Sequence, residues 1–175
     1  AGLNYPDNLI VQGLYQFRPD LPFSPGHEGA GIISGVGKNV SSFNVGDRVA
    51  FFKGFGAFAE KIVVPEALAF PLQEKFPFHV AGGMFMVYST SLLALKQRAN
   101  IKAGDEVLVL GAAGGVGLAA VDLAKAYGAR VVAAVSTKGY RLTHTRSIGP
   151  YPSSLRVFMS SSLSLLARIP PCTAG

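Results

Sequence analysis

The sequence contains little of what marks secreted, metal-clustered or membrane-spanning proteins. Cys172 is the only cysteine in 175 residues, and tryptophan is absent. A single cysteine allows no intrachain disulfide and no cysteine cluster for a structural metal. No apolar run reaches the length of about 18 residues that a transmembrane helix needs, and the first residues do not form a secretory signal. We therefore expect no membrane partner and a cytoplasmic location, with a mitochondrial one left open.

Acidic residues are missing from the last part of the chain, where none follows Asp122. Residues 1–138 carry 12 basic and 10 acidic side chains, a net charge of +2, and residues 139–175 carry four arginines. The formal charge of +6 is therefore largely a property of the tail. The body has no basic face interleaved with aromatic residues, so we expect no nucleic-acid partner.

One stretch, residues 106–137, has the pattern of a nucleotide-binding unit. Residues 106–110 are rich in Val and Leu, which predicts a buried parallel strand. Apolar residues then recur on one helical face from Val116 to Tyr127, and Gly128 predicts the end of that helix. Residues 130–135 predict a second strand. Strand, glycine-rich bend, helix and strand together make a βαβ unit.

The bend in this unit matches the fingerprint G-x-G-x-x-G with alanine in the first place. A glycine at the second place lets the backbone approach a pyrophosphate, and a glycine at the third lets helix and strand pack closely. The helix N-terminus adds N–H donors. A purely structural turn also needs glycine, but the flanking strand and helix favour dinucleotide binding. The predicted cofactor-binding residues here are Ala112, Ala113, Gly114, Gly115, Val116 and Gly117.

The end of the second strand indicates which dinucleotide is bound. NAD-binding units place an acidic residue there, about 20 residues beyond the glycines, to bind the ribose hydroxyls. This chain has Ser136, Thr137 and Lys138 instead. A hydroxyl and a cation suit a 2′-phosphate, so we favour NADPH over NADH, with Ser136 and Lys138 as contacts. The alternative is that Lys138 is an ordinary solvated loop residue.

The first half of the chain has a different character. Residues 1–75 are rich in glycine, proline and short apolar segments, a pattern typical of a small all-β barrel. We expect strands at residues 30–36, 48–52 and 58–64, separated by glycine turns. One short helical turn is expected within residues 7–15.

The middle and the tail complete the expected order of elements. Residues 65–77 predict a connecting segment, and residues 79–99 predict a helix that ends in cations. In residues 139–175 the apolar patches at 155–159 and 163–166 show no alternation of strand and helix. We therefore predict only two strands for the second sheet and a poorly ordered, atypical tail.

Four segments occur together in a recognisable order and spacing. They are AGLNYPDNLIVQGLYQ (1–16), LPFSPGHEGAGIISGVG (21–37), NVGDRVAF (44–51) and KAGDEVLVLGAAGGVGLAAVDLAKAYGARVVAAVST (102–137). This combination resembles the medium-chain dehydrogenase/reductase superfamily, and within it the zinc-free NADPH:quinone oxidoreductase branch that includes the zeta-crystallin-like proteins. The resemblance covers residues 1–138 and not the tail. Because the first segment begins at Ala1, we expect the chain to be part of a longer protein.

The resemblance implies a fold of the class α/β plus β. A GroES-like β-barrel, lacking its N-terminal strands, would be followed by a Rossmann domain truncated to a βαβ unit. The expected domains are residues 1–78 for substrate and catalysis, 79–138 for the start of the dinucleotide-binding domain, and 139–175 for the tail.

The resemblance also implies an activity, the transfer of hydride from NADPH to a small-molecule quinone or conjugated carbonyl. Asn4 and Tyr15 match polar residues that line the nicotinamide and substrate end, and Thr90 matches a threonine near the nicotinamide. Zinc-dependent relatives carry ligands at or near the positions of Asn4, His27 and Met86, of which only His27 is a ligand type. Because a catalytic zinc takes three protein ligands, we expect no metal.

Three other functions stay open at this point. The chain could belong to an enoyl reductase of the same superfamily, which shares fold and cofactor. It could be an inactive truncated or frame-shifted fragment, because the family-like sequence stops after Lys138. A structural role of the lens-crystallin kind is the third. Full-length relatives are expected to be homo-oligomers, whereas the state of this chain is unknown.

Overall fold

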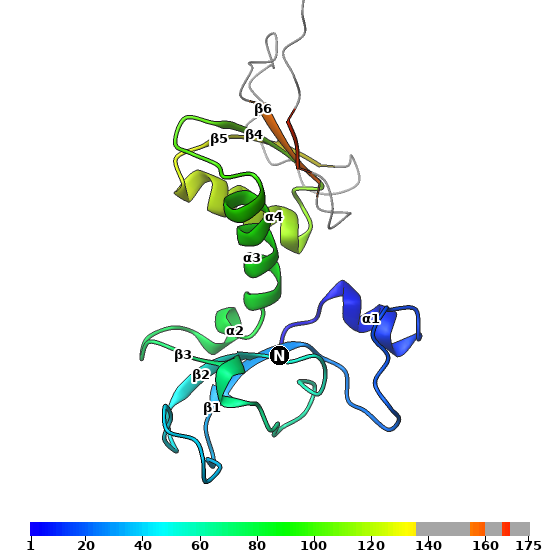
Figure 1. Ribbon diagram of the computed structural model, residues 1–175, viewed down its shortest axis with the longest axis vertical. Helices are drawn as coiled ribbons and strands as arrows, with labels where there is room; N and C mark the ends of the chain where they lie inside the picture. Colours follow the sequence, from blue (N-terminus) through cyan, green and yellow to red (C-terminus); the bar gives the residue numbers. More distant parts are fainter. Residues whose placement is uncertain (136–154, 160–165, 169–175) are drawn as a thin grey trace, which may run out of the picture. The chain divides into compact units, whose positions relative to one another are not determined.

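The computed structural model describes residues 1–135, 155–159 and 166–168 of the 175-residue chain (Figure 1). The chain divides into two compact units, Ala1–Met86 and Val87–Gly175. None of the helices in the described part of the chain has both the length and the hydropathy of a membrane span. The expected domain ranges, 1–78, 79–138 and 139–175, stay predictions.

The first unit is built on a three-stranded antiparallel sheet in the order β1-β2-β3. Its elements are α1 (Tyr5–Val11), β1 (Glu28–Ile32), β2 (Arg48–Phe52), a 3₁₀ turn η1 (Glu66–Leu68), β3 (Ala69–Pro71) and α2 (Phe78–Ala81). Glu28 is opposite Phe52, and Val49 is opposite Pro71. The middle strand supplies buried residues to this unit, because Val49, Ala50 and Phe51 are all shielded from solvent.

The pairing of β1 with β2 brings an aromatic ring close to one glycine. Gly29 is opposite Phe51, and a Cβ built on Gly29 would lie 2.5 Å from the Phe51 ring. The ring therefore covers the β1 backbone where a side chain would otherwise stand. This close packing explains why a strand that begins Glu-Gly-Ala-Gly is stable despite the low strand propensity of glycine.

The predicted strand at residues 48–52 is confirmed, and two other expectations for this unit are wrong. The first strand begins and ends earlier than expected, at Glu28–Ile32. Residues 58–64 are not a strand, because Ala57 and Phe58 donate their N–H groups to Gly26 and Pro25 in a loop. The sheet instead takes its third strand from Ala69–Pro71, inside the segment that we expected only to connect.

The second unit contains a four-stranded sheet in the order β5-β4-β6-β7. Its strands are β4 (Glu106–Leu110), β5 (Arg130–Ala134), β6 (Leu155–Met159) and β7 (Leu166–Arg168), and its helix α4 is Gly115–Ala126. Strands β5 and β6 are both parallel to β4, whereas β7 is antiparallel to β6. Helix α4 packs along β4 and β5 (Figure 1). The predicted βαβ unit is therefore confirmed.

Two expectations for this half of the chain are corrected. The helix expected at residues 79–99 is three pieces: α2, α3 (Phe85–Leu92) and the π-helical segment η2 (Leu93–Arg98). The break between α2 and α3 falls at Gly82 and Gly83, where helix propensity is low. The sheet has four strands rather than two, because the tail supplies β6 and β7.

The core of the second unit lies between β4, α4 and η2. Its most buried members are Leu95, Ile101, Val107, Val109, Ala112, Ala120 and Ala124. Val107 and Val109 alternate along β4 and so share one face of the sheet. Ala120 and Ala124 are one helical turn apart on α4, and their small side chains let the helix approach that face closely.

Candidate functional site

The glycine-rich turn of the second unit follows directly on β4. Gly111 has a φ of +69°, a left-handed conformation that glycine adopts readily. The N–H of Gly114 donates to the Gly111 carbonyl at 3.1 Å, which closes the turn, and Gly114 is the N-cap of α4. The first hydrogen bond into the helix runs from Leu118 N–H to the Gly114 carbonyl, 2.8 Å. The turn therefore aims the start of α4 at the carboxyl end of β4.

Two glycines of this turn are needed for different reasons. A Cβ on Gly117 would overlap the carbonyl oxygen of Gly111 and lie 2.8 Å from Ala112 Cα. Glycine at 117 is therefore required by the packing of helix against strand. Within the part of the chain that the structure describes, a Cβ on Gly114 would meet only the Gly111 carbonyl oxygen, at an ordinary 3.5 Å. Protein packing does not require glycine at 114, so the open space there is available to an approaching group.

The surroundings of the turn suit an anion. The N–H groups of Gly115, Val116 and Gly117 are in the first turn of α4, where helix geometry offers no acceptor. The helix dipole adds partial positive charge at the same place. In the sheet, β4 has β5 on one side and β6 on the other, both parallel to it. Ligands of open α/β sheets bind beyond the carboxyl ends of strands at such a point.

Helix α3 is tied to α4 by two hydrogen bonds. The hydroxyl of Ser91, which is fully buried, donates to the Val116 carbonyl at 2.8 Å. The hydroxyl of Tyr88 donates to Asp122 Oδ2, also at 2.8 Å. This hydrogen bond to Asp122 raises the pKa of Tyr88, with smaller contributions from partial burial and the Asp122 charge. The first of these hydrogen bonds fixes the opening turn of α4, which carries the candidate anion site.

The predicted cofactor residues are distributed as follows. Ala112 is buried, and its N–H donates to the Ala134 carbonyl at 3.1 Å. Thr90 is half-buried in α3, beside Ser91. Ser136 and Lys138 lie outside the described residues.

Two residues of this region, Gly111 and Ser91, were not predicted from the sequence. The position of Gly111 directly after a strand was a usable signal, whereas nothing in the sequence distinguishes Ser91 from its neighbours.

The first unit contains a buried polar cluster, made by Asn4, Asp7, His27 and Glu28. Asp7 is 2% exposed and accepts three hydrogen bonds. They come from Asn4 N–H at 2.7 Å, Gly26 N–H at 3.1 Å and His27 Nδ1–H at 2.6 Å. Asn4 is the N-cap of α1 and Asp7 is its third residue, which is the spacing of a capping box. One carboxylate thus joins the start of α1 to the loop before β1.

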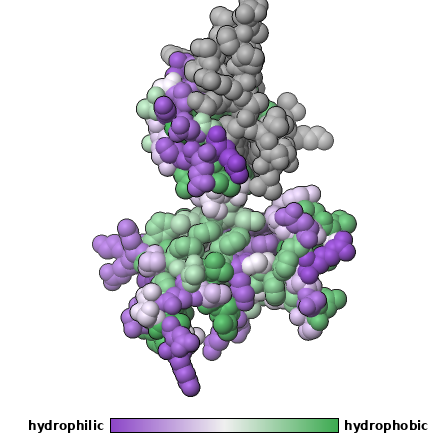
Figure 2. Space-filling model, in the orientation of Figure 1, coloured by the Kyte–Doolittle hydropathy of each residue, from purple (hydrophilic) through white to green (hydrophobic). Residues whose placement is uncertain are grey.

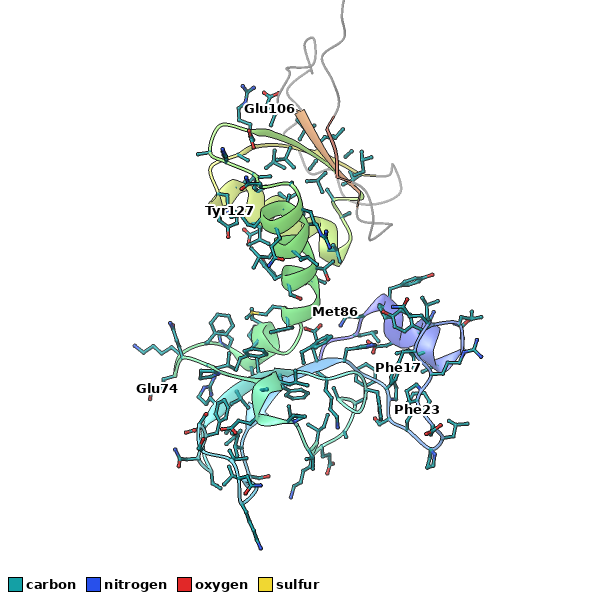
Figure 3. The ribbon with its side chains drawn as sticks, viewed as in Figure 1. Phe17, Phe23, Glu74, Met86, Glu106 and Tyr127 are labelled. Atoms are coloured by element: carbon teal, nitrogen blue, oxygen red, sulfur yellow. The ribbon has the colours of Figure 1, made fainter. Side chains whose placement is uncertain are left out.

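Glu28 forms the other half of the polar cluster. It is 1% exposed. Its Oε1 accepts a hydrogen bond from Asn4 Nδ2 at 2.6 Å, and its Oε2 accepts one from Met86 N–H at 2.9 Å. Met86 is in the first turn of α3 and is labelled in Figure 3. Asn4 is therefore bound through its backbone by Asp7 and through its side chain by Glu28.

Both residues that we predicted to act in catalysis lie at this cluster. The ring of Tyr15 meets the His27 ring edge-on, with centroids 6.3 Å apart, and His27 stacks with Phe52 at 6.4 Å. Asn4 is a member of the cluster itself. Asp7 and Glu28 were not predicted as site residues, although the spacing from Asn4 to Asp7 carried a signal for the first.

The polar cluster is not arranged as a metal site. The position of Met86 contributes only a backbone N–H, and Asn4 contributes an amide that is bound to Glu28. In the part of the chain that the structure describes, no group of three or more His, Cys, Asp or Glu side chains could hold a metal ion. The expected absence of a metal stays a prediction.

A groove of about 570 Å³ opens beside the cluster. Its lining residues are Leu3, Asn4, Tyr5, Asp7, Asn8, Val11, Pro25 and Phe58. Apolar residues predominate, and a few polar groups come from α1 and its cap, which is the usual character of a small-molecule site. Leu3, Tyr5 and Val11 are well exposed. Apolar residues cover much of the visible face of this unit (Figure 2).

Comparison with known proteins identifies the family. Residues 1–74 match the alcohol dehydrogenase GroES-like domain. The chain is 40% identical over 139 residues to quinone oxidoreductase of Sus scrofa, covering 79% of this chain and 42% of that protein. It is 39% identical over 142 residues to a probable quinone oxidoreductase of Schizosaccharomyces pombe, covering 81% and 43%. The chain belongs to the medium-chain dehydrogenase/reductase superfamily.

Solved structures of this superfamily agree. A probable oxidoreductase from Mycobacterium abscessus superposes with a TM-score of 0.74 at 38% identity, covering 79% of this chain and 44% of that one. Quinone oxidoreductase from Thermus thermophilus, which was also solved in complex with NADPH, superposes with a TM-score of 0.65 at 38% identity. The match covers 77% of this chain and 42% of that one. CurK enoyl reductase gives 0.70 at 32% identity, covering 78% and 44%.

These matches confirm the expected family branch and fold class, a GroES-like domain followed by part of a Rossmann domain. The chain spans about two fifths of the length of the quinone oxidoreductases that it matches.

Proposed function

We propose that this chain is part of an oxidoreductase that transfers hydride from NADPH to a quinone or conjugated carbonyl without zinc. Its relatives in Sus scrofa and Schizosaccharomyces pombe are named as quinone oxidoreductases. The relative from Thermus thermophilus forms a complex with NADPH. The substrate would be a small molecule, as the apolar groove beside Asn4 also suggests.

The observation that carries the proposal is the contrast between Gly117 and Gly114. Gly117 is required by the protein's own packing, whereas among the described residues a Cβ at Gly114 would make a single ordinary contact, with the Gly111 carbonyl oxygen. A turn that only had to connect β4 with α4 would need glycine at 117 and not at 114. Space at 114, beside the N–H groups that begin α4, fits the diphosphate of a dinucleotide.

Several residues would hold the dinucleotide. The main-chain N–H groups of Ala113 and of residues 115–117 would donate hydrogen bonds to the diphosphate, and Ser136 and Lys138 would bind the 2′-phosphate. Thr90 would lie near the nicotinamide. The preference for NADPH is supported by the sequence after β5, where no acidic residue is available to bind a free ribose hydroxyl pair.

The dinucleotide, when bound, supplies the hydride, and the protein orients the reactants and excludes water. Asn4 and Tyr15 would donate hydrogen bonds to the acceptor oxygen of the substrate. Such donors stabilise negative charge as it develops on that oxygen. Solvent can supply the proton that completes the reduction, so no side chain is needed as a general acid.

An enoyl reductase of the same superfamily is the second candidate. The likeness to CurK enoyl reductase, at 32% identity, supports it. The two functions use the same fold and cofactor and differ in the acceptor. A panel of quinones, enones and enoyl thioesters, each tested with NADPH at equal concentration, separates them by the ratio of kcat/KM values.

A third candidate is an inactive truncated or frame-shifted fragment. It is supported by the end of the family resemblance at residue 138 and by the partial coverage of the relatives. NADPH titration of the purified 175-residue chain, followed by nicotinamide fluorescence, tests the proposal against it. Saturable binding supports the oxidoreductase, and an unchanged fluorescence supports the inactive fragment.

A further inference from the structure

Asn4 is held at two separate points by two different buried carboxylates. Asp7 Oδ2 accepts a hydrogen bond from its backbone N–H at 2.7 Å, and Glu28 Oε1 accepts one from its side-chain Nδ2 at 2.6 Å. The Asp7 contact is the half of a capping box that satisfies the N-cap N–H. The Glu28 contact lies outside that box and acts on the amide group alone.

Burying Glu28 is costly. A carboxylate that is 1% exposed loses its hydration, and within the described residues no Lys, Arg or His forms an ion pair with it. Its hydrogen-bond partners are two neutral N–H groups, on Asn4 and Met86. A glutamine side chain at this position would need one neighbouring group that donates a hydrogen bond to its oxygen and one that accepts a hydrogen bond from its NH₂ group. Glu28 differs from a glutamine because both of its oxygens accept hydrogen bonds here, from Asn4 and from Met86, whereas a glutamine amide accepts at one end only.

That difference fixes the orientation of the Asn4 amide. A carboxylate oxygen must be met by the NH₂ end of the amide and not by its oxygen. One N–H of Asn4 therefore faces Glu28, and the second N–H and Oδ1 are directed elsewhere. Asn4 also lines the groove that it shares with Leu3, Val11 and Phe58. A planar apolar carbonyl compound in this groove would meet an amide whose donor end is set in advance.

We propose that Glu28 is a positioning residue, which orients the Asn4 amide so that its second N–H donates to the substrate's carbonyl oxygen. The proposal rests on the role of Asn4 in the proposed function. Glu28 does not touch the substrate, and its effect on turnover passes through Asn4.

The first test is independent of activity. In a ¹H–¹⁵N spectrum of the assigned wild-type chain, the two Asn4 side-chain protons should differ widely in shift. The proton bound to Glu28 should exchange slowly with solvent. Glu28→Gln should shift this pair, whereas Glu74→Gln, the same change at an exposed carboxylate (Figure 3), should leave it unchanged. A wild-type pair with the shifts and fast exchange of an exposed amide would overturn the proposal.

The second test separates positioning from stability. Glu28→Gln should lower kcat for quinone reduction at least about tenfold with little change in KM for NADPH, because a misdirected donor is lost mainly from the transition state. The double variant Asn4→Asp with Glu28→Gln restores the hydrogen bond with its polarity reversed, since the introduced glutamine can donate to the introduced aspartate. Its thermal midpoint should return toward that of the wild type.

The kcat of the double variant should stay low, because position 4 then offers no side-chain N–H. Recovery of kcat together with the thermal midpoint would show that Glu28 acts only through stability, and would overturn the proposal. If the wild-type protein reduces no quinone, enone or enoyl thioester, the proposed function fails. The spectral test still decides whether Glu28 sets the Asn4 amide.

Discussion

The carbonyl oxygen of Gly111 occupies the place where a side chain at Gly117 would begin. Strand β4 and helix α4 are brought so close by the turn between them that only a hydrogen atom fits at residue 117. The same turn leaves Gly114 open toward solvent. The oxidoreductase proposal depends on this difference between two glycines of one motif.

Gly117→Ala should therefore destabilise the second unit. The added methyl group would meet backbone atoms of Gly111 and Ala112, which cannot rotate away as a side chain could. Overpacking of this kind costs about 1–3 kcal/mol. Chemical denaturation followed by circular dichroism measures the free energy of unfolding. An unchanged value would mean that β4 and α4 are farther apart than the structure has them.

Gly114→Ala is the matched control for Gly117→Ala. We expect it to weaken NADPH binding and to leave the stability nearly unchanged. The methyl group meets only an ordinary contact of 3.5 Å, so the free energy of unfolding should change by less than about 1 kcal/mol, chiefly through weaker N-capping. The affinity for NADPH should fall at least about tenfold, which is about 1.4 kcal/mol, because the methyl group fills the space for the diphosphate. Equal affinities in wild type and variant would argue against that use of the space.

Asp7→Asn should destabilise the first unit. The asparagine side chain has one oxygen that accepts hydrogen bonds and one NH₂ group that does not. At least one of the three donors, Asn4 N–H, Gly26 N–H and His27 Nδ1–H, would therefore lose its acceptor. Breaking charged, buried hydrogen bonds costs about 2–4 kcal/mol. Asp20→Asn, at an exposed carboxylate, is the control and should change the thermal midpoint little. A similar midpoint for both variants would contradict the hydrogen bonds assigned to Asp7.

Tyr88 should make the free energy of unfolding of the second unit depend on pH in the alkaline range. Its hydrogen bond to Asp122 raises its pKa in the folded state above that in the unfolded state. The stabilisation is therefore fully present below the unfolded value of about 10, and it is lost as the pH rises through the folded value.

The measurement for this prediction compares the free energy of unfolding of wild type and Tyr88→Phe across that range of pH. The wild type should lose stability more steeply than the variant. The difference should be small, because the Tyr88 side chain is partly exposed and solvent screens its interaction with Asp122. If the free energies of unfolding of wild type and Tyr88→Phe fall in parallel with pH, Tyr88 is not the cause of the loss of stability.

The sequence predicted those parts of the fold whose signals are local. Strands β4 and β5 and helix α4 were found because buried apolar runs and a helical apolar face mark them directly. Gly82 and Gly83 divide the expected long helix, a break that the overall apolar pattern concealed. Strand β3 is three residues long and ends in proline, so its identity depends on pairing with β2 rather than on its own residues.

The residues of the candidate site likewise fall into those with a local sequence signal and those without one. Motif spacing predicted residues 112–117 as site residues, and the family resemblance predicted Asn4 and Tyr15. The partners Glu28 and Ser91 could not be found in this way, because their contacts with Met86 and Val116 span 58 and 25 residues of sequence. Only the capping-box spacing from Asn4 indicated Asp7. Long-range hydrogen bonds to backbone groups leave no pattern in the side chains. Strand β6 was missed for a related reason, since its place beside β4 is set by pairing across the sheet.

The central claim is that the main chain at the start of α4 receives the diphosphate of a dinucleotide. Titration of the purified wild-type chain and of Gly114→Ala with NADPH, followed by nicotinamide fluorescence, tests it most directly. We expect saturable binding by the wild type and much weaker binding by the variant, with both chains equally folded by circular dichroism. A folded wild-type chain that does not bind NADPH, or a variant that binds it equally well, would show that this main chain does not receive the diphosphate.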